Sequence, residues 1–107
     1  MIWKKITDNE LSNFIDAEIK KMPANLKLDF DKIKVELHRE DCIRNNLQEK
    51  NGLYIVANHR QKKLIYDDVE DEFGITKSYN NKIIECWDLF PTLESAIKKL
   101  LENKKSE

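Results

Sequence analysis

The 107-residue chain contains little glycine, proline or cysteine, with two residues of each kind. So few glycines and prolines argue against a disordered linker and against an all-β fold with many tight turns. They also exclude the glycine-rich phosphate-binding loops, because neither GxxxxGK[ST] nor GxGxxG occurs. Cys42 and Cys86 lie 44 positions apart and neither belongs to a CxxC pair. We therefore expect two reduced thiols and no disulfide.

Long apolar runs and an excess of charge of one sign are absent as well. No run approaches the roughly 20 apolar residues of a membrane-spanning helix, and no apolar segment of a secretion signal follows Lys4 and Lys5. The 19 Lys and Arg nearly cancel the 20 Asp and Glu, which leaves a net charge of −1. Such a chain has no general attraction to nucleic acid or to membranes. We expect one cytoplasmic domain over residues 1–107, without a cofactor.

Two segments have the apolar spacing of amphipathic helices. Thr7 and Glu10 have the S/T-x-x-E spacing of a capping box. They precede an apolar stripe of period 3.6, which predicts a helix over 8–22. Thr92 precedes a second stripe and is suited to cap a C-terminal helix. The first stripe consists of Leu11, Phe14, Ile15, Ile19 and Met22, and the second of Leu93, Ala96, Ile97, Leu100 and Leu101.

After the first predicted helix, apolar residues over 26–37 alternate as they do in β-strands. The phase of the alternation changes at 29–32, so the segment is either one bulged strand or a short strand followed by a longer one. The polar residues 40–52 fit either a short helix near 41–48 or a loop. The β-favouring runs are 32–39, 53–57, 63–66 and 82–87, and a loop of four or five residues joins the middle two into a hairpin.

The resulting order is α-β-β-β-β-α. Consecutive strands with short connections favour antiparallel pairing. Both amphipathic helices must bury their apolar stripes, and one face of the sheet can accept both. We therefore predict an α+β fold of two layers, with an antiparallel sheet of about four strands and the N- and C-terminal helices packed on one face.

One short polar segment has residues that could perform acid–base chemistry. His38, Arg39 and Glu40 are adjacent, and a small ribonuclease could use such a group as a general acid with phosphate-binding partners. Adjacent residues of a strand point to opposite faces, however, so only His38 and Glu40 share a face. We favour a solvated strand end here, and a small ribonuclease stays an alternative.

Five carboxylates fall within the six positions 67–72, in a chain of almost no net charge. Their spacing is close to that of a calcium-binding loop, but Phe73 stands where that loop needs glycine, so we expect no metal site. The run is either a solvated loop, as charge runs usually are, or a docking patch for a basic protein with aromatic anchors beside it. The docking hypothesis predicts contacts through Asp67, Asp68, Glu70, Asp71, Glu72, Tyr66 and Tyr79.

The basic counterpart of this run is segment 59–63, His-Arg-Gln-Lys-Lys, in the loop of the predicted hairpin. We interpret it as a solubilising turn. A nucleic-acid-binding module is an alternative function, because the order of helices and strands resembles that of double-stranded RNA-binding domains. The basic loop cluster on which those domains depend is missing, and contact with nucleic acid is therefore disfavoured.

The stretch 64–75, followed by a tryptophan strand and the FPTLESAI segment at 90–97, resembles small bacterial immunity proteins of polymorphic and contact-dependent toxin systems. The resemblance covers about half of the chain. It implies a non-enzymatic cytoplasmic protein that binds and blocks one cognate toxin, often a nuclease. Those families share no catalytic motif, so the resemblance assigns no site residue. Because nuclease toxins are basic where they grip their substrate, the acidic run is the surface that we expect to meet such a toxin.

Overall fold

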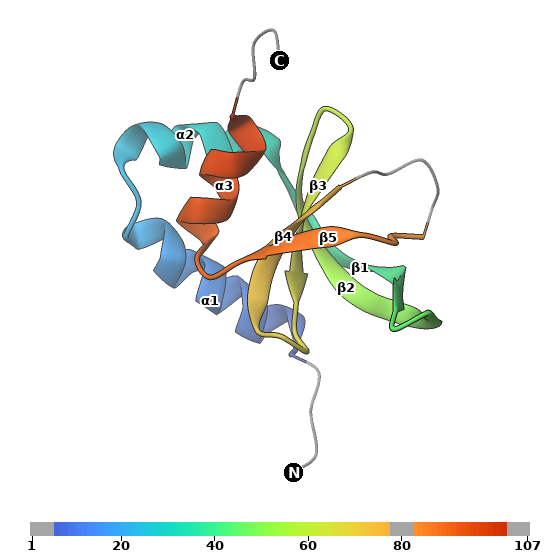
Figure 1. The fold of residues 1–107 in the computed structure, drawn as a ribbon. Coiled ribbons are helices and arrows are strands. Elements are labelled where there is room, and N and C mark those ends of the chain that lie inside the picture. Colours follow the sequence, from blue (N-terminus) through green and yellow to red (C-terminus); the bar gives the residue numbers. More distant parts are fainter. Residues whose placement is uncertain (1–5, 78–82, 103–107) are drawn as a thin grey trace, which may run out of the picture.

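The computed structural model of the chain describes residues 6–77 and 83–102. They form three helices and a five-stranded antiparallel sheet whose strands lie in sequential order (Figure 1). The predicted α+β class, with helices at both ends of the chain, is confirmed. The helices are α1 (Asp8–Lys20), α2 (Ala24–Ile33) and α3 (Leu93–Leu101), and the strands are β1 (Lys34–Arg44), β2 (Leu47–His59), β3 (Lys62–Asp67), β4 (Glu72–Thr76) and β5 (Trp87–Phe90).

Side-chain caps fix the starts of the two predicted helices. The Thr7 hydroxyl accepts a hydrogen bond from the Glu10 amide, and the Glu10 carboxylate accepts one from the Thr7 amide, at 3.1 and 2.9 Å. This is the predicted capping box of α1. Thr92 caps α3 in the same way through the Ser95 amide. These bonds satisfy amides that a helix start otherwise leaves without acceptors.

Helix α2 replaces the bulged or short strand that the sequence suggested for residues before 32. Leu26 and Phe30 are buried while Leu28, between them, is 64% exposed. The alternation of Leu26, Leu28 and Phe30 was thus misleading, because Leu26, Phe30 and Ile33 also fit the helical spacing i, i+4, i+7. Pro23 stands at the N-cap, where its missing N–H costs no hydrogen bond.

The short helix suggested near 41–48 is also wrong, because β1 and β2 form a long hairpin there. Asn45 and Asn46 join the strands with φ angles of 55° and 66°. A two-residue hairpin turn requires such left-handed residues, and asparagine tolerates them better than other residues with a side chain. The loop between β2 and β3 likewise has two residues, Arg60 and Gln61, where four or five were expected.

Strand β4 was not predicted, and β5 begins at Trp87, where the last predicted strand ended. Gly74 lies inside β4 and not in a loop. A Cβ atom at this position would stand 2.8 Å from the carbonyl oxygen of Asp88 on β5 and 3.1 Å from the Ile65 side chain on β3. Glycine therefore allows three strands to approach closely at this point.

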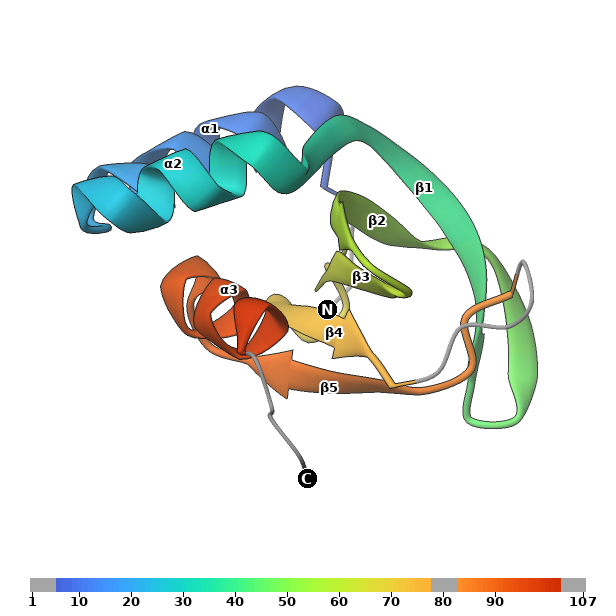
Figure 2. The same cartoon turned by 90° about the horizontal axis from the view of Figure 1, so that it is seen from above.

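The sheet curls until the segment before β5 meets β1 (Figure 2). The amide of Ile43 donates to the Ile84 carbonyl at 2.9 Å, and the amide of Ile84 donates to the Asp41 carbonyl at 3.1 Å. The two predicted helices, α1 and α3, lie on one face of the sheet, as expected (Figure 2). The additional helix α2 lies on the same face, and all three share the main core with the sheet (Figure 2). The curl encloses a second, smaller core on the other face, formed by Cys42, Leu53, Ile55, Ile65 and Ile84.

Candidate functional site

The acidic run forms the turn between β3 and β4. Asp67 and Glu72 pair across the ends of these strands, and residues 68–71 make the connection. Asp71 closes the turn with a φ of 58°, a left-handed conformation that aspartate adopts more readily than most residues. We call residues 67–72 the acidic turn. Its six positions are held in one compact loop, but its carboxylates occupy different environments.

Asp67 is fully buried and is bound by groups of the chain itself. Its Oδ2 accepts hydrogen bonds from Arg44 Nη1 at 3.0 Å and from Trp87 Nε1 at 3.2 Å. Its Oδ1 accepts from the amides of Val69 at 3.1 Å and Glu70 at 3.4 Å. The carboxylate thus folds the turn around itself, as aspartate does at the start of many turns. It is a structural anchor of the acidic turn and not part of its surface.

Asp68 is the second internal anchor, with a side chain that is only 3% exposed. Its Oδ2 accepts from Arg39 Nη2 at 2.9 Å and from the Ile6 amide at 3.1 Å. The Arg39 guanidinium also lies over the Tyr54 ring, 4.1 Å from the ring centroid, where a cation–π attraction holds it. The acidic turn is therefore tied both to β1 and to the segment that leads into α1.

The other three carboxylates remain at the surface. Glu70 and Asp71 are exposed and Glu72 is half-buried. Among the residues that the structure describes, no lysine or arginine forms an ion pair with any of them. Asp71 accepts a hydrogen bond from the Tyr66 hydroxyl, and Val69 exposes 39% of its surface beside these acids.

One of the two predicted aromatic anchors, Tyr66, is not at this surface. Tyr66 is 2% exposed and packs against Phe14 and Phe73 in the main core. Burial, together with the hydrogen bond to Asp71, raises the pKa of the Tyr66 phenol. Tyr79 lies outside the described residues. The exposed apolar group of the acidic turn is Val69, which the sequence analysis did not single out.

Arg44 links the acidic turn to the smaller core and was likewise not identified from the sequence. Besides Asp67 it binds Glu49, with Nε 3.1 Å from Oε1. Burial disfavours its charge, but the hydrogen bonds and charges of Asp67 and Glu49 outweigh this effect and raise the pKa of the guanidinium overall. Burial raises the pKa of the neighbouring Cys42 thiol to about 11, so this thiol is protonated and inert at neutral pH.

The residues of the alternative catalytic group lie on opposite faces of β1. His38 Nε2 lies 3.2 Å from Glu40 Oε2, so these two side chains share a face as predicted. Glu40 is bound to Lys63 at 2.8 Å, and Arg39 points to the other face toward Asp68. In the described part of the chain, no three histidine, cysteine or acidic side chains come close enough together to hold a metal ion.

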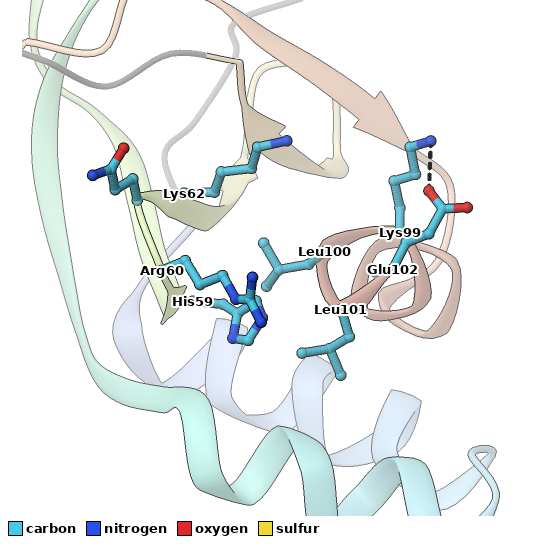
Figure 3. Close-up of a pocket in the computed structure, with 8 residues that line it drawn as sticks. His59, Arg60, Lys62, Lys99, Leu100, Leu101 and Glu102 are labelled. Carbon is cyan, nitrogen blue, oxygen red and sulfur yellow. Dashed lines mark hydrogen bonds and ion pairs between the residues drawn. The ribbon is translucent and has the colours of Figure 1, made fainter. Parts of the chain in front are cut away.

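A groove of about 670 Å³ lies at the opposite end of β3 (Figure 3). Lys62 begins this strand beside the groove, and Asp67 ends it in the acidic turn. The six residues of β3 therefore separate an acidic end from a basic end by roughly 17 Å. The groove is lined by His59, Arg60, Gln61 and Lys62 from the β2–β3 hairpin and by Lys99, Leu100, Leu101 and Glu102 from the end of α3.

Comparison of the chain with models of protein families, with curated proteins and with solved structures finds no match. No helix in the described ranges combines the length and the apolar character needed to cross a membrane. Inference about function therefore rests on the geometry and charge of the two ends of the molecule.

Proposed function

We propose that this chain is a non-enzymatic protein-binding domain that engages a basic partner through the surface of its acidic turn. In its most specific form, which follows the resemblance noted above, the chain is a cytoplasmic immunity protein and the partner is its cognate nuclease toxin. The observation that carries the proposal is a set of three surface carboxylates, Glu70, Asp71 and Glu72, on a turn that buried ion pairs hold in place.

Mutual repulsion makes this surface receptive to cations. The three carboxylates are consecutive, and each raises the electrostatic energy of its neighbours. Within the described structure the chain's own cations bind Asp67 and Asp68 and not these three. A basic partner would relieve the repulsion, and opposite charge would steer it toward this end of the molecule and speed association.

Preorganisation supports the same proposal. The Asp67 carboxylate holds the amides of Val69 and Glu70, and Asp68 is fixed by Arg39. A turn that is already ordered loses little conformational entropy when a partner binds, so more of the contact energy appears as affinity. The exposed Val69 side chain adds an apolar contact beside the three carboxylates, and its burial against a partner would slow dissociation.

The test uses the double variant Glu70→Lys/Glu72→Lys, which leaves Asp67, Asp68 and the Tyr66–Asp71 hydrogen bond unchanged. The matched control reverses two exposed carboxylates elsewhere, Asp16→Lys/Glu36→Lys. The immunity proposal predicts that a large secreted protein with a toxin-type C-terminal domain is encoded directly upstream of this chain's gene. That C-terminal domain is the probe, and the association rate is measured by biolayer interferometry at low and high salt.

We expect the double variant to associate at least about tenfold more slowly than the control at low salt, with a smaller difference at high salt. Equal rates and equal salt dependence would remove the acidic turn from the interface. The immunity function is tested separately by coexpression of the same toxin domain. If the unaltered chain neither binds that domain nor restores growth, the immunity proposal is wrong.

A further inference from the structure

The groove between the β2–β3 hairpin and α3 is a second surface with a distinct character. Of the residues in the described ranges, three cationic side chains, Arg60, Lys62 and Lys99, line it together with one carboxylate, Glu102. Glu102 already forms an ion pair with Lys99, at 3.0 Å. The arginine and Lys62 form no ion pair with any residue that the structure describes. The groove therefore carries positive charge in a chain whose net charge is −1.

The interior of the groove is partly apolar. Leu100 is 5% exposed and Leu101 is half-buried, and both belong to the last turn of α3. Figure 3 shows His59 and Arg60 of the hairpin pointing toward these two leucines. Cations at the rim and leucines inside make a surface that is complementary to an anion with an attached aliphatic group.

We propose that this groove binds a short acidic peptide segment of a partner protein, with an aliphatic side chain on the leucines and carboxylates on the lysines and Arg60. The inference goes beyond the proposed function, because it concerns the other end of β3 and a partner of opposite charge. The volume of about 670 Å³ suits a segment of a few residues.

Charge and composition favour a peptide over the other anions. Among the residues that the structure describes, no aromatic ring lines the groove apart from the His59 imidazole, whereas single-stranded nucleic acids need rings on which successive bases stack. Free phosphate would gain nothing from contact with the leucines, because it has no apolar surface to remove from water. An acidic peptide with a leucine can contact both the cations at the rim of the groove and the two leucines inside it.

The rim of the groove is held in a fixed shape. Arg60 occupies the two-residue hairpin turn with a φ of 59°. The neighbouring Lys63, which faces away from the groove, binds Glu40 of β1 at 2.8 Å and ties the hairpin to the sheet. On the other side, α3 is packed into the main core through Ile97 and Leu100. A peptide would thus meet a preformed surface.

The experiment is a titration of the ¹⁵N-labelled full chain with the peptide acetyl-Asp-Glu-Leu-Leu-Asp-Glu-amide, followed by amide chemical shifts. We expect saturable shifts that are largest at Arg60, Lys62, Lys99 and Leu101. The variant Lys62→Ala/Lys99→Ala should bind about fivefold more weakly. The control Lys27→Ala/Lys50→Ala has the same net charge and removes two exposed lysines outside the groove, and it should bind as the unaltered chain does.

Two further probes separate the alternatives. A peptide in which both leucines are replaced by glycine should bind at least fivefold more weakly, since it keeps the charges and loses the apolar contact. Equal affinity for the two peptides, or an equal loss of peptide affinity in the groove variant and the control variant, would overturn the proposal. Tighter binding of tripolyphosphate or of duplex RNA to the same residues would also overturn it. Because no probe uses the acidic turn, failure here leaves the proposed function untouched.

Discussion

The buried pair of Asp67 and Arg44 should be the most sensitive point of the structure that lies outside the apolar cores. The perturbation is Asp67→Asn, which keeps the shape of the side chain and removes its charge. In one orientation, the new NH₂ group faces Arg44 Nη1 and Trp87 Nε1. In the unaltered protein these two groups donate hydrogen bonds to Asp67 Oδ2. In the flipped orientation, the NH₂ group faces the amides of Val69 and Glu70.

Either orientation therefore leaves two donors without an acceptor. The side chain of Asp67 is 1% exposed and that of Arg44 is 17% exposed, so water can compensate only on the arginine side. Breaking a buried ion pair on one side costs about 3–5 kcal/mol. Arg44 keeps its bond to Glu49, which places the expected loss at the lower end, about 3 kcal/mol. For a domain of this size that loss corresponds to a fall in Tm of roughly 10–20 °C.

The assay is urea unfolding followed by circular dichroism, together with a thermal scan. The matched control is Asp88→Asn, since Asp88 is 57% exposed and its ion pair with Lys77, at 3.4 Å, is at the surface. That control should lose less than about 0.5 kcal/mol. If Asp67→Asn costs less than about 1 kcal/mol, the interpretation of Asp67 as the internal anchor of the acidic turn is refuted.

Three other predictions concern backbone spacing and titration. Gly74→Ala should lower the unfolding free energy by about 1–3 kcal/mol, measured in urea, because its Cβ would meet the Asp88 carbonyl at 2.8 Å. At pH 8, a disulfide reagent should modify exposed Cys86 quickly and buried Cys42 only upon unfolding; two fast thiols would contradict this. Burial raises the Cys42 pKa from 9.0 to about 11. The contribution of this protonated thiol to the free energy of unfolding is therefore complete below pH 9 and is lost as the pH rises from 9 to 11. Urea midpoints that stay constant over that range would contradict the shift.

The sequence was sufficient to predict a helix or strand where the local pattern fits only one kind of secondary structure. The capping box of α1, the N-cap threonine of α3 and the apolar stripes of both predict these helices, because capping and amphipathicity depend only on residues a few positions apart. The β-favouring runs 53–57 and 63–66 predict the centre of the β2–β3 hairpin for the same reason. The adjacency of His38 and Glu40 on one face also follows from the two-residue period of a strand.

Local patterns predicted the wrong element where the same spacing fits both a helix and a strand. Leu26 and Phe30 satisfy both the helical and the alternating spacing, and burial against the sheet selects the helix. The scarcity of glycine was a poor guide to turns. Asn45, Asn46, Arg60 and Asp71 take the left-handed conformation in the hairpin turns, and none of the described glycines does. The strands on either side impose these angles, and the stability of the sheet offsets their cost.

The composition of the acidic turn was determined by the sequence, but its function as a surface was decided by the tertiary structure. Five carboxylates in six positions are visible in the sequence. That Asp67 and Asp68 are internal anchors depends on Arg44 and Arg39, which precede them by 23 and 29 positions and reach them because only β2 separates β1 from β3 in the sheet. The basic groove likewise exists only because α3 brings Lys99 beside the hairpin. Charge pairing acts over a few ångströms of space and not along the chain, so the fold decides which charges remain for a partner.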